Sequence, residues 1–122
     1  MARGILALQE IVRTGVTPSL GAGDSANGHY FDNRSQEVYI QVKNGDASPI
    51  NVTIVTPGTI DGMAIPDLVV VIPATTGDKL IGPFRNDLYG QAEQALSKAV
   101  IIDLSADTSV TIGAFVMGDV NY

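Results

Sequence analysis

The sequence predicts an all-β protein, a single antiparallel β-sandwich or barrel-like domain of about seven to eight short strands with an N-terminal arm. First, short apolar runs rich in Val, Ile, Thr and aromatic residues recur along most of the 122 residues. Second, Gly, Pro and Asn-Gly or Asp-Gly steps separate these runs at short intervals. Third, the length fits one domain, and no linker-like stretch divides it.

The first 28 residues differ in composition from the rest and form the predicted arm. In residues 5–18, ILALQEIVRTGVTP, the apolar positions break clean alternation, so a helix and an edge strand are comparable interpretations up to the final proline. Residues 20–28, LGAGDSANG, have the small, polar composition of a mobile loop. We therefore predict an arm and flexible loop over residues 1–28 and a β-sandwich domain over residues 29–122.

The predicted strands follow this loop at short intervals. They read, in order, HYF, EVYIQVKN, INVTIVT, DLVVVIPA, KLIGPF, KAVIIDLS and SVTIGAFVMG. Between them, Asn44-Gly45-Asp46 and Asp61-Gly62 can take positive φ in turns. Pro49, Pro57 and Pro66 have no backbone donor and so close strands.

Two stretches do not fit a simple alternating strand. In residues 87–100, DLYGQAEQALSKAV, Leu and Ala fall at helical offsets, so a short helix ahead of the KAVIIDLS strand is an alternative. In Leu68–Ile72 every residue is apolar, whereas a half-exposed antiparallel strand alternates. Both faces of this strand need cover, which a subunit interface, a local bend or the N-terminal arm would supply.

The sequence contains no motif that indicates catalysis or cofactor binding. Residues 74–79, ATTGDK, lack the first glycine, the hydroxyl after lysine and the helix of a phosphate loop, so we predict a turn in which Gly77 can take positive φ. His29 is the only histidine and cysteine is absent, so no triad or metal set is expected. One metal hypothesis stays open, a weak cation site between subunits through Asp24 or Asp46. We predict no catalytic residue, no resident metal, no cofactor and no enzyme activity.

Charge and hydropathy limit the partners of the chain. It has 13 acidic and 7 basic residues, and the net charge of −6 repels phosphate backbones and anionic membranes. Neither nucleic acid nor a membrane is therefore a predicted partner. An apolar fraction of 45% beside 16% charged residues indicates a surface that a partner covers in part. The start of the chain lacks the apolar core of a signal peptide, which predicts synthesis in the cytosol.

Several stretches carry a resemblance to a known class of protein. They are GVTPSL, a strand ending in KNGD, the stretch VTIVTPGTIDGMAIPD, the turn leading to IGPF, and GAFVM near the end. Over roughly residues 13–117 the sequence resembles small virion proteins of tailed bacteriophages, in particular capsid decoration or cement proteins. The resemblance implies a β-sandwich on the outer capsid surface of the virion, made in the cytoplasm of the bacterial host. Its implied partners are the major capsid protein and copies of itself, with a trimer favoured.

We expect contacts with the capsid or with other copies in the arm, in the loop before residue 29 and on the apolar strand. The candidate interface residues are Ile5, Leu6, Leu8, Ile11, Val12, Asp24, His29, Leu68, Val70 and Ile72. Two other functions are alternatives: a head-tail connector, neck or tail protein, which would form a ring, and a carbohydrate-binding module for host attachment. The absence of Trp counts against the second alternative.

Overall fold

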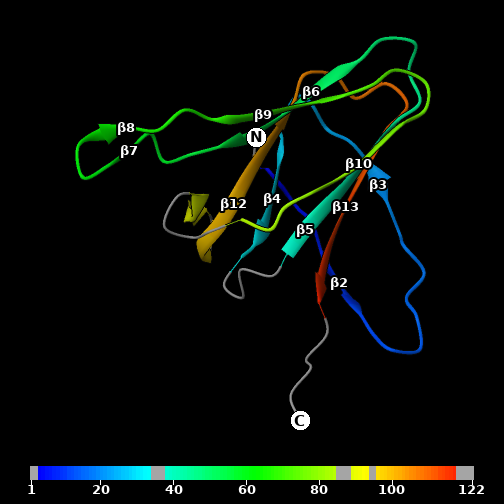
Figure 1. Ribbon diagram of the computed structural model, residues 1–122, viewed down its shortest axis with the longest axis horizontal. Helices are drawn as coiled ribbons and strands as arrows, with labels where there is room; N and C mark the ends of the chain where they lie inside the picture. Colours follow the sequence, from blue (N-terminus) through cyan, green and yellow to red (C-terminus); the bar gives the residue numbers. More distant parts are fainter. Residues whose placement is uncertain (1–2, 34–37, 85–88, 94–95, 118–122) are drawn as a thin grey trace.

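The computed structural model describes residues 3–33, 38–84, 89–93 and 96–117, and these residues fold into two β-sheets packed face to face (Figure 1). Within this described part, one sheet has six strands, the other has five, and a two-stranded hairpin projects from the body. The predicted all-β sandwich is confirmed, with two separate sheets instead of one closed barrel across the described residues.

The six-stranded sheet draws its strands from the whole length of the chain. They are β1 (Gly4–Ile5), β4 (His29–Asp32), β6 (Ile50–Val55), β9 (Leu68–Ile72), β11 (Gln91–Glu93) and β12 (Leu96–Leu104). Their order is β1-β4-β12-β6-β9, and β11 pairs with the first part of β12. The two lateral edges of this sheet are therefore β1 and β9.

The five-stranded sheet packs against the first and has its own two edges. Its strands are β2 (Leu8–Ile11), β3 (Gly21–Ala22), β5 (Val38–Asn44), β10 (Gly77–Ile81) and β13 (Val110–Met117). The order is β10-β5-β13-β2, and β3 also pairs with β13. The projecting hairpin consists of β7 (Thr59–Ile60) and β8 (Met63–Ala64), between β6 and β9 (Figure 1).

The core lies between the two sheets and follows from alternation along their strands. In β5, the alternate residues Val38, Ile40 and Val42 are fully buried, and the same spacing buries Val52 and Ile54 in β6. These side chains belong to one continuous cluster contributed by both sheets. Burial of this kind contributes roughly 1.5–3 kcal/mol for each large aliphatic side chain.

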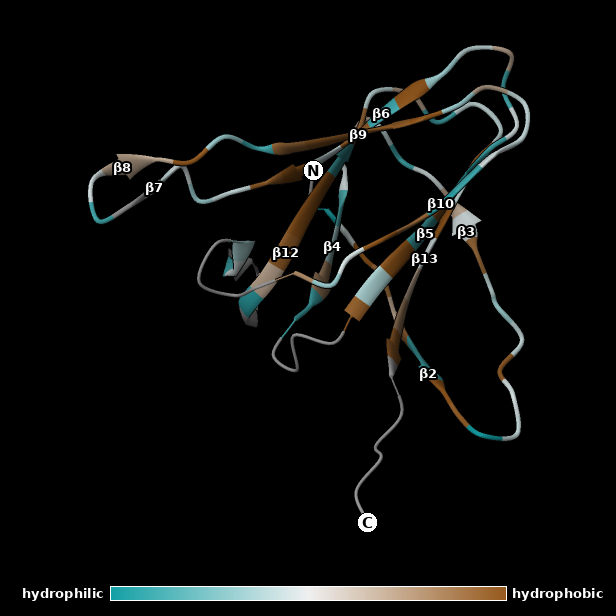
Figure 2. Ribbon diagram, viewed as in Figure 1, coloured by the Kyte–Doolittle hydropathy of each residue, from teal (hydrophilic) through white to brown (hydrophobic). Residues whose placement is uncertain are grey.

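The middle of the central strand β12 is apolar (Figure 2), and its successive residues point to the two faces of the sheet. Ile102 faces the core, while Ile101 and Ala99 point to the opposite face and are also buried. There they pack with Tyr30 of the neighbouring strand β4 and with the half-buried Val55. The second face of this strand is thus covered within the chain itself.

The sheets differ from the prediction in strand direction and number. The predicted sandwich was antiparallel, but β1 pairs with β4 and β2 pairs with β13 in parallel. The described residues form 13 strands, more than the seven or eight expected. The additional strands are mostly two-residue pairings, which are too short to leave an apolar pattern in the sequence.

The helical alternative for residues 87–100 was wrong where the structure describes it. Gln91–Glu93 and the first residues of β12 are extended and paired with each other. Ala99 is also in register with Asp32 of β4, so pairing within the sheet overrides the helical spacing of Leu and Ala. Residues 87–88 and 94–95 lie outside the described residues.

The turns use backbone conformations that were only partly predicted. Asp61 and Gly62 take positive φ, 51° and 78°, as expected for the tip of the hairpin. In the turn between β9 and β10, however, Thr75 takes the positive φ of 69° and Gly77 does not. A glycine is required at position 77 because an added Cβ would overlap the carbonyl oxygen of Pro73.

Candidate interaction surface

The turn that follows β3 is held by one carboxylate and one imidazole. Asp24 accepts two backbone N–H groups of the turn at 3.1 Å through Oδ1 and the Asn27 amide at 2.9 Å through Oδ2. The N–H of Asp24 donates to Nε2 of His29 at 2.9 Å, so the neutral ring carries its proton on Nδ1. The Ser25 N–H and hydroxyl donate to Asp107 at 2.8 and 3.0 Å. The small residues predicted as a mobile loop therefore make hydrogen bonds to the body.

The pKa values of three groups in this network are lowered, two by hydrogen bonds and one by burial. Hydrogen bonds from Asn27, first from its side chain, lower the pKa of the Asp24 carboxyl, and those from the backbone and hydroxyl of Ser25 lower the pKa of Asp107. Burial lowers the pKa of His29 below its ordinary value of 6.5. The Asp24 carboxylate opposes that shift, and the Arg3 guanidinium adds to it. At neutral pH the two carboxylates are charged and the ring is neutral, which suits a structural network.

A cleft of about 370 Å³ opens beside this network, along the edge of β13. Strand β2 pairs with β13 from Ala114 onward and β3 pairs with it up to Ile112, so Gly113 lies at the gap between them. The Gln9 amide holds the backbone of Ser19 across the gap, with hydrogen bonds of 2.7 and 2.8 Å. The lining is mostly small and apolar, and it includes no Asp, Glu, Lys or Arg. The cleft thus offers shape and apolar contact without paired acid and base groups.

The described residues contain neither a cluster of metal-ligating side chains nor a membrane-spanning helix. No group of three or more His, Cys, Asp or Glu side chains among these residues is arranged to hold a metal ion. Their structure also includes no helix with the length and hydrophobicity that a membrane crossing needs.

Exposed apolar side chains mark two opposite edges of the sandwich. Eight large apolar residues are exposed among those described, and all lie on edge strands, directly beside one, or on the projecting hairpin. Three of them, here called the N-terminal edge, lie on or beside β1 and β2: Ile5, Leu8 and Val12. The other five, here called the hairpin edge, lie on β8, β9 and β10: Met63, Leu68, Val69, Val71 and Leu80.

The hairpin edge continues beyond the body of the sandwich (Figure 1). At the joint between β6 and β7, the Thr56 N–H donates to Asp67 at 2.9 Å, and its hydroxyl lies 3.0 Å from the Ile65 carbonyl oxygen. The Ile65 N–H donates to the Gly58 carbonyl at 2.9 Å. These bonds join the β6–β9 pair to the β7–β8 tip, where Met63 is 72% exposed. A neighbouring molecule can therefore reach an apolar tip that extends from the body.

The structure distributes the ten predicted interface residues among three environments. Four are exposed: Ile5, Leu8, Val12 and Leu68. Three are half-buried and apolar, and two of these pack against the core: Leu6, Val70 and Ile11. The remaining three are Ile72, which is fully buried in the core, and Asp24 and His29, which belong to the turn network. As a core residue, Ile72 offers no surface to a partner in this conformation.

Four exposed apolar residues were missed as individual candidates, namely Met63, Val69, Val71 and Leu80. In the run LVVVI every residue is apolar, so the sequence alone does not say which set of alternate residues points outward. Burial resolves this, because Val70 and Ile72 face inward while Val69 and Val71 are about half exposed. A residue at a hairpin tip, such as Met63, has no pattern that would distinguish it.

Comparisons with protein-family models, with curated proteins and with solved structures found no match. The class that the fold defines is an all-β sandwich of two mixed sheets.

Proposed function

We propose that this chain is a virion structural protein of a tailed bacteriophage, a capsid decoration (cement) protein that binds the outside of the assembled head. The observation that best supports this is the placement of exposed apolar side chains on two opposite edges of one small sandwich. A subunit with two separate contact surfaces can bridge two neighbours. The resemblance to decoration proteins adds the capsid as the surface that is bridged.

The proposed mechanism is stabilisation by linkage. A subunit that binds only the assembled shell lowers the free energy of that state, and one that spans two capsid subunits opposes their separation. The proposed partners are the major capsid protein and other copies of the chain, in a trimer. The net charge of −6 suits an outer position, because the inside of the head holds DNA phosphates. No catalytic step, cofactor, nucleic acid or membrane enters the proposal.

The copy number per particle tests this function directly. In purified virions of the phage that encodes the chain, quantitative mass spectrometry should find a number comparable with that of the major capsid protein. A handful of copies would contradict the cement role and favour a neck, connector or tail position. Absence from the particle would contradict a virion role altogether.

A binding experiment tests whether the N-terminal edge contributes. Purified shells that lack the chain are mixed with the wild-type protein, with Leu8→Asp, and with Thr108→Asp as a matched control. Each variant adds one negative charge at an exposed position, but Thr108 lies outside both edges. We expect Leu8→Asp to weaken binding about tenfold or more, which corresponds to about 1.4 kcal/mol, and the control to bind as wild type does. Equal binding by all three would exclude Leu8 from the contact.

A further inference from the structure

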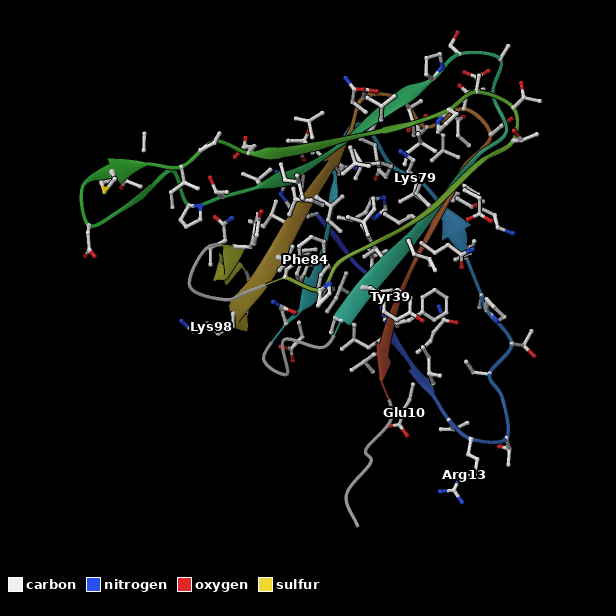
Figure 3. The ribbon with its side chains drawn as sticks, in the orientation of Figure 1. Glu10, Arg13, Tyr39, Lys79, Phe84 and Lys98 are labelled. Carbon is white, nitrogen blue, oxygen red and sulfur yellow. The ribbon has the colours of Figure 1, made fainter. Side chains whose placement is uncertain are left out.

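The four strands at the ends of the two sheet orders, β1, β9, β10 and β2, differ in how well they resist pairing with another chain. An edge strand exposes unpaired backbone N–H and C=O groups, and proteins protect it by shortness, charge or proline. Strand β1 has only two residues, β2 contains Glu10, and β10 contains Asp78 and Lys79 (Figure 3). Strand β9 has five residues, all apolar, with no charge and no proline. It is the one edge of the described sheets without such protection.

The geometry of β9 is regular along its whole length. It pairs with β6 from Ile50↔Ile72 to Ile54↔Leu68 with no bulge, and with no other strand in the described part of the chain. Val70 and Ile72 point into the core, while Val69 and Val71 are 52% and 51% exposed. The strand therefore presents an even backbone edge bordered by apolar side chains, and Figure 2 colours β9 as hydrophobic.

The lack of charge along β9 leaves that edge open to a second copy of this chain. Two copies of net charge −6 repel each other over most of their surfaces. Residues 68–77 contain no charged side chain. The nearest carboxylate before them, Asp67, accepts the N–H of Thr56 at 2.9 Å and is thus directed toward the β6 side, away from the free edge. Two copies can approach along β9 without placing like charges opposite each other.

We propose that β9 pairs with β9 of a second copy, antiparallel and about a twofold axis at Val70. In this register Val69 lies opposite Val71 of the second copy, and Leu68 lies opposite Ile72. Because LVVVI is apolar from either end, every cross-strand pair is apolar, and the outward residues of both copies share one face of the joined sheet. The contact is isologous, which twofold symmetry requires.

Part of the hairpin edge enlarges this contact. Leu80, which is 64% exposed, pairs with Gln41 and therefore lies on the outer face of the other sheet, away from Val69 and Val71. A stable interface buries roughly 800 Å² per partner, which two five-residue strands cannot supply alone. The projecting β7–β8 tip, where Met63 is 72% exposed, provides additional apolar surface. This inference concerns a twofold pair in solution and depends neither on the proposed capsid function nor on the trimer proposed for the shell.

Sedimentation velocity on the purified full chain tests whether the pairing forms. We expect a monomer–dimer equilibrium that shifts toward dimer with protein concentration and with added salt, since salt screens the repulsion between two acidic copies. Val71→Lys places a charge at the contact and should raise the dissociation constant about tenfold or more. Thr108→Lys, the same class of change outside both edges, should leave it unchanged. Circular dichroism establishes that each variant is folded.

Engineered cysteines test the register, because the chain has no cysteine of its own. Val69→Cys and Val71→Cys proteins, mixed under mild oxidation, should form a disulfide-linked dimer, since these positions face each other across the twofold axis. Val69→Cys alone should link poorly, because its two copies lie diagonally, roughly 7–8 Å apart. A wild-type chain that stays monomeric up to about 1 mM would overturn the proposal. So would a trimer without this cross-link, or equal cross-linking in the mixed and single pools.

Discussion

The N-terminal edge and the hairpin edge expose similar side chains but are built differently. At the N-terminal edge, short parallel strands are held by polar contacts within the chain, including the Gln9 clamp on Ser19 and the ion pair between Arg3 and Asp103. At the hairpin edge, β9 has five apolar residues with an unpaired backbone edge, and the polar joint at Thr56 lies behind it. The strands of the first edge are short or charged, which limits pairing with another chain, while the second edge leaves the backbone groups of a longer, uncharged strand for a partner.

The largest expected loss of stability should come from the buried face of β9, and its exposed face should contribute little. Ile72→Ala removes a fully buried side chain and should lower the free energy of unfolding by about 2–5 kcal/mol. Val71→Ala changes its exposed neighbour and should cost less than about 0.5 kcal/mol. Urea unfolding at low protein concentration, where association contributes little, measures both values.

The matched pair also tests the proposed partner surface. If Val71→Ala destabilised the dilute monomer as much as Ile72→Ala does, both faces of β9 would be covered within one chain. The hairpin edge would then have no open apolar surface, and the contrast with the N-terminal edge would disappear.

The second effect compares a glycine at each edge. Gly77→Ala would force a Cβ into the Pro73 carbonyl, so the turn that joins β9 to β10 must shift, at a cost of about 1–3 kcal/mol. Gly21→Ala, in β3 near the N-terminal edge, meets no atom within 4 Å and should change the free energy of unfolding by less than about 0.5 kcal/mol. Thermal unfolding of both variants beside wild type gives the comparison, and equal losses would contradict the close approach at Gly77.

Interior strands and edge strands differ in how well the sequence could predict them. Alternation in VYIQVKN and INVTIV was sufficient to predict β5 and β6, because each has one face in the core. The run of residues 68–72 indicated a strand with apolar side chains on both faces. Because its composition is uniform, the sequence did not determine which alternate residues point outward. Strands β1 and β3 exist only through pairing with residues distant in sequence, so no local pattern indicates them.

The candidate surface was predicted less completely than the fold. Ile5, Leu8, Val12 and Leu68 were expected to be available and are exposed. The network of Asp24, Ser25 and Asp107 could not be predicted, since it depends on a contact across 82 residues of sequence. Composition alone does not distinguish glycines that permit close packing, such as Gly23 beside Leu104, from glycines of an open loop.

A third, smaller effect concerns the joint that supports the hairpin tip. Thr56→Val keeps the buried shape but removes the hydroxyl that contacts Ile65 and Asp67, and it should cost about 1 kcal/mol. Thr53→Val, at a half-exposed position in the neighbouring strand β6, is the matched control and should be nearly neutral. Hydrogen exchange at the Ile65 amide should accelerate in Thr56→Val only. An unchanged exchange rate would mean that the tip is held without this joint.

The smallest effect is a pH dependence that belongs to the N-terminal side of the molecule. The folded pKa of His29 is lowered by burial, so between that value and 6.5 the unfolded chain binds a proton that the folded chain does not. Stability should therefore be complete above pH 6.5 and should decline as the pH falls below it. The lowered pKa values of Asp24 and Asp107 add a separate loss in more acidic solution, below their ordinary value of 3.8.

Replacement of the imidazole separates these two steps. His29→Gln retains an oxygen that can accept the Asp24 N–H but does not titrate, so the decline that begins near pH 6.5 should vanish while the acidic step persists. Urea midpoints measured from pH 8 to pH 3 resolve both steps. Val71→Ala, at the opposite edge, should keep the whole wild-type profile, because β9 contains no titratable side chain. A decline near pH 6.5 that survived in His29→Gln would show that the histidine is not its source and that another group links stability to pH in this range.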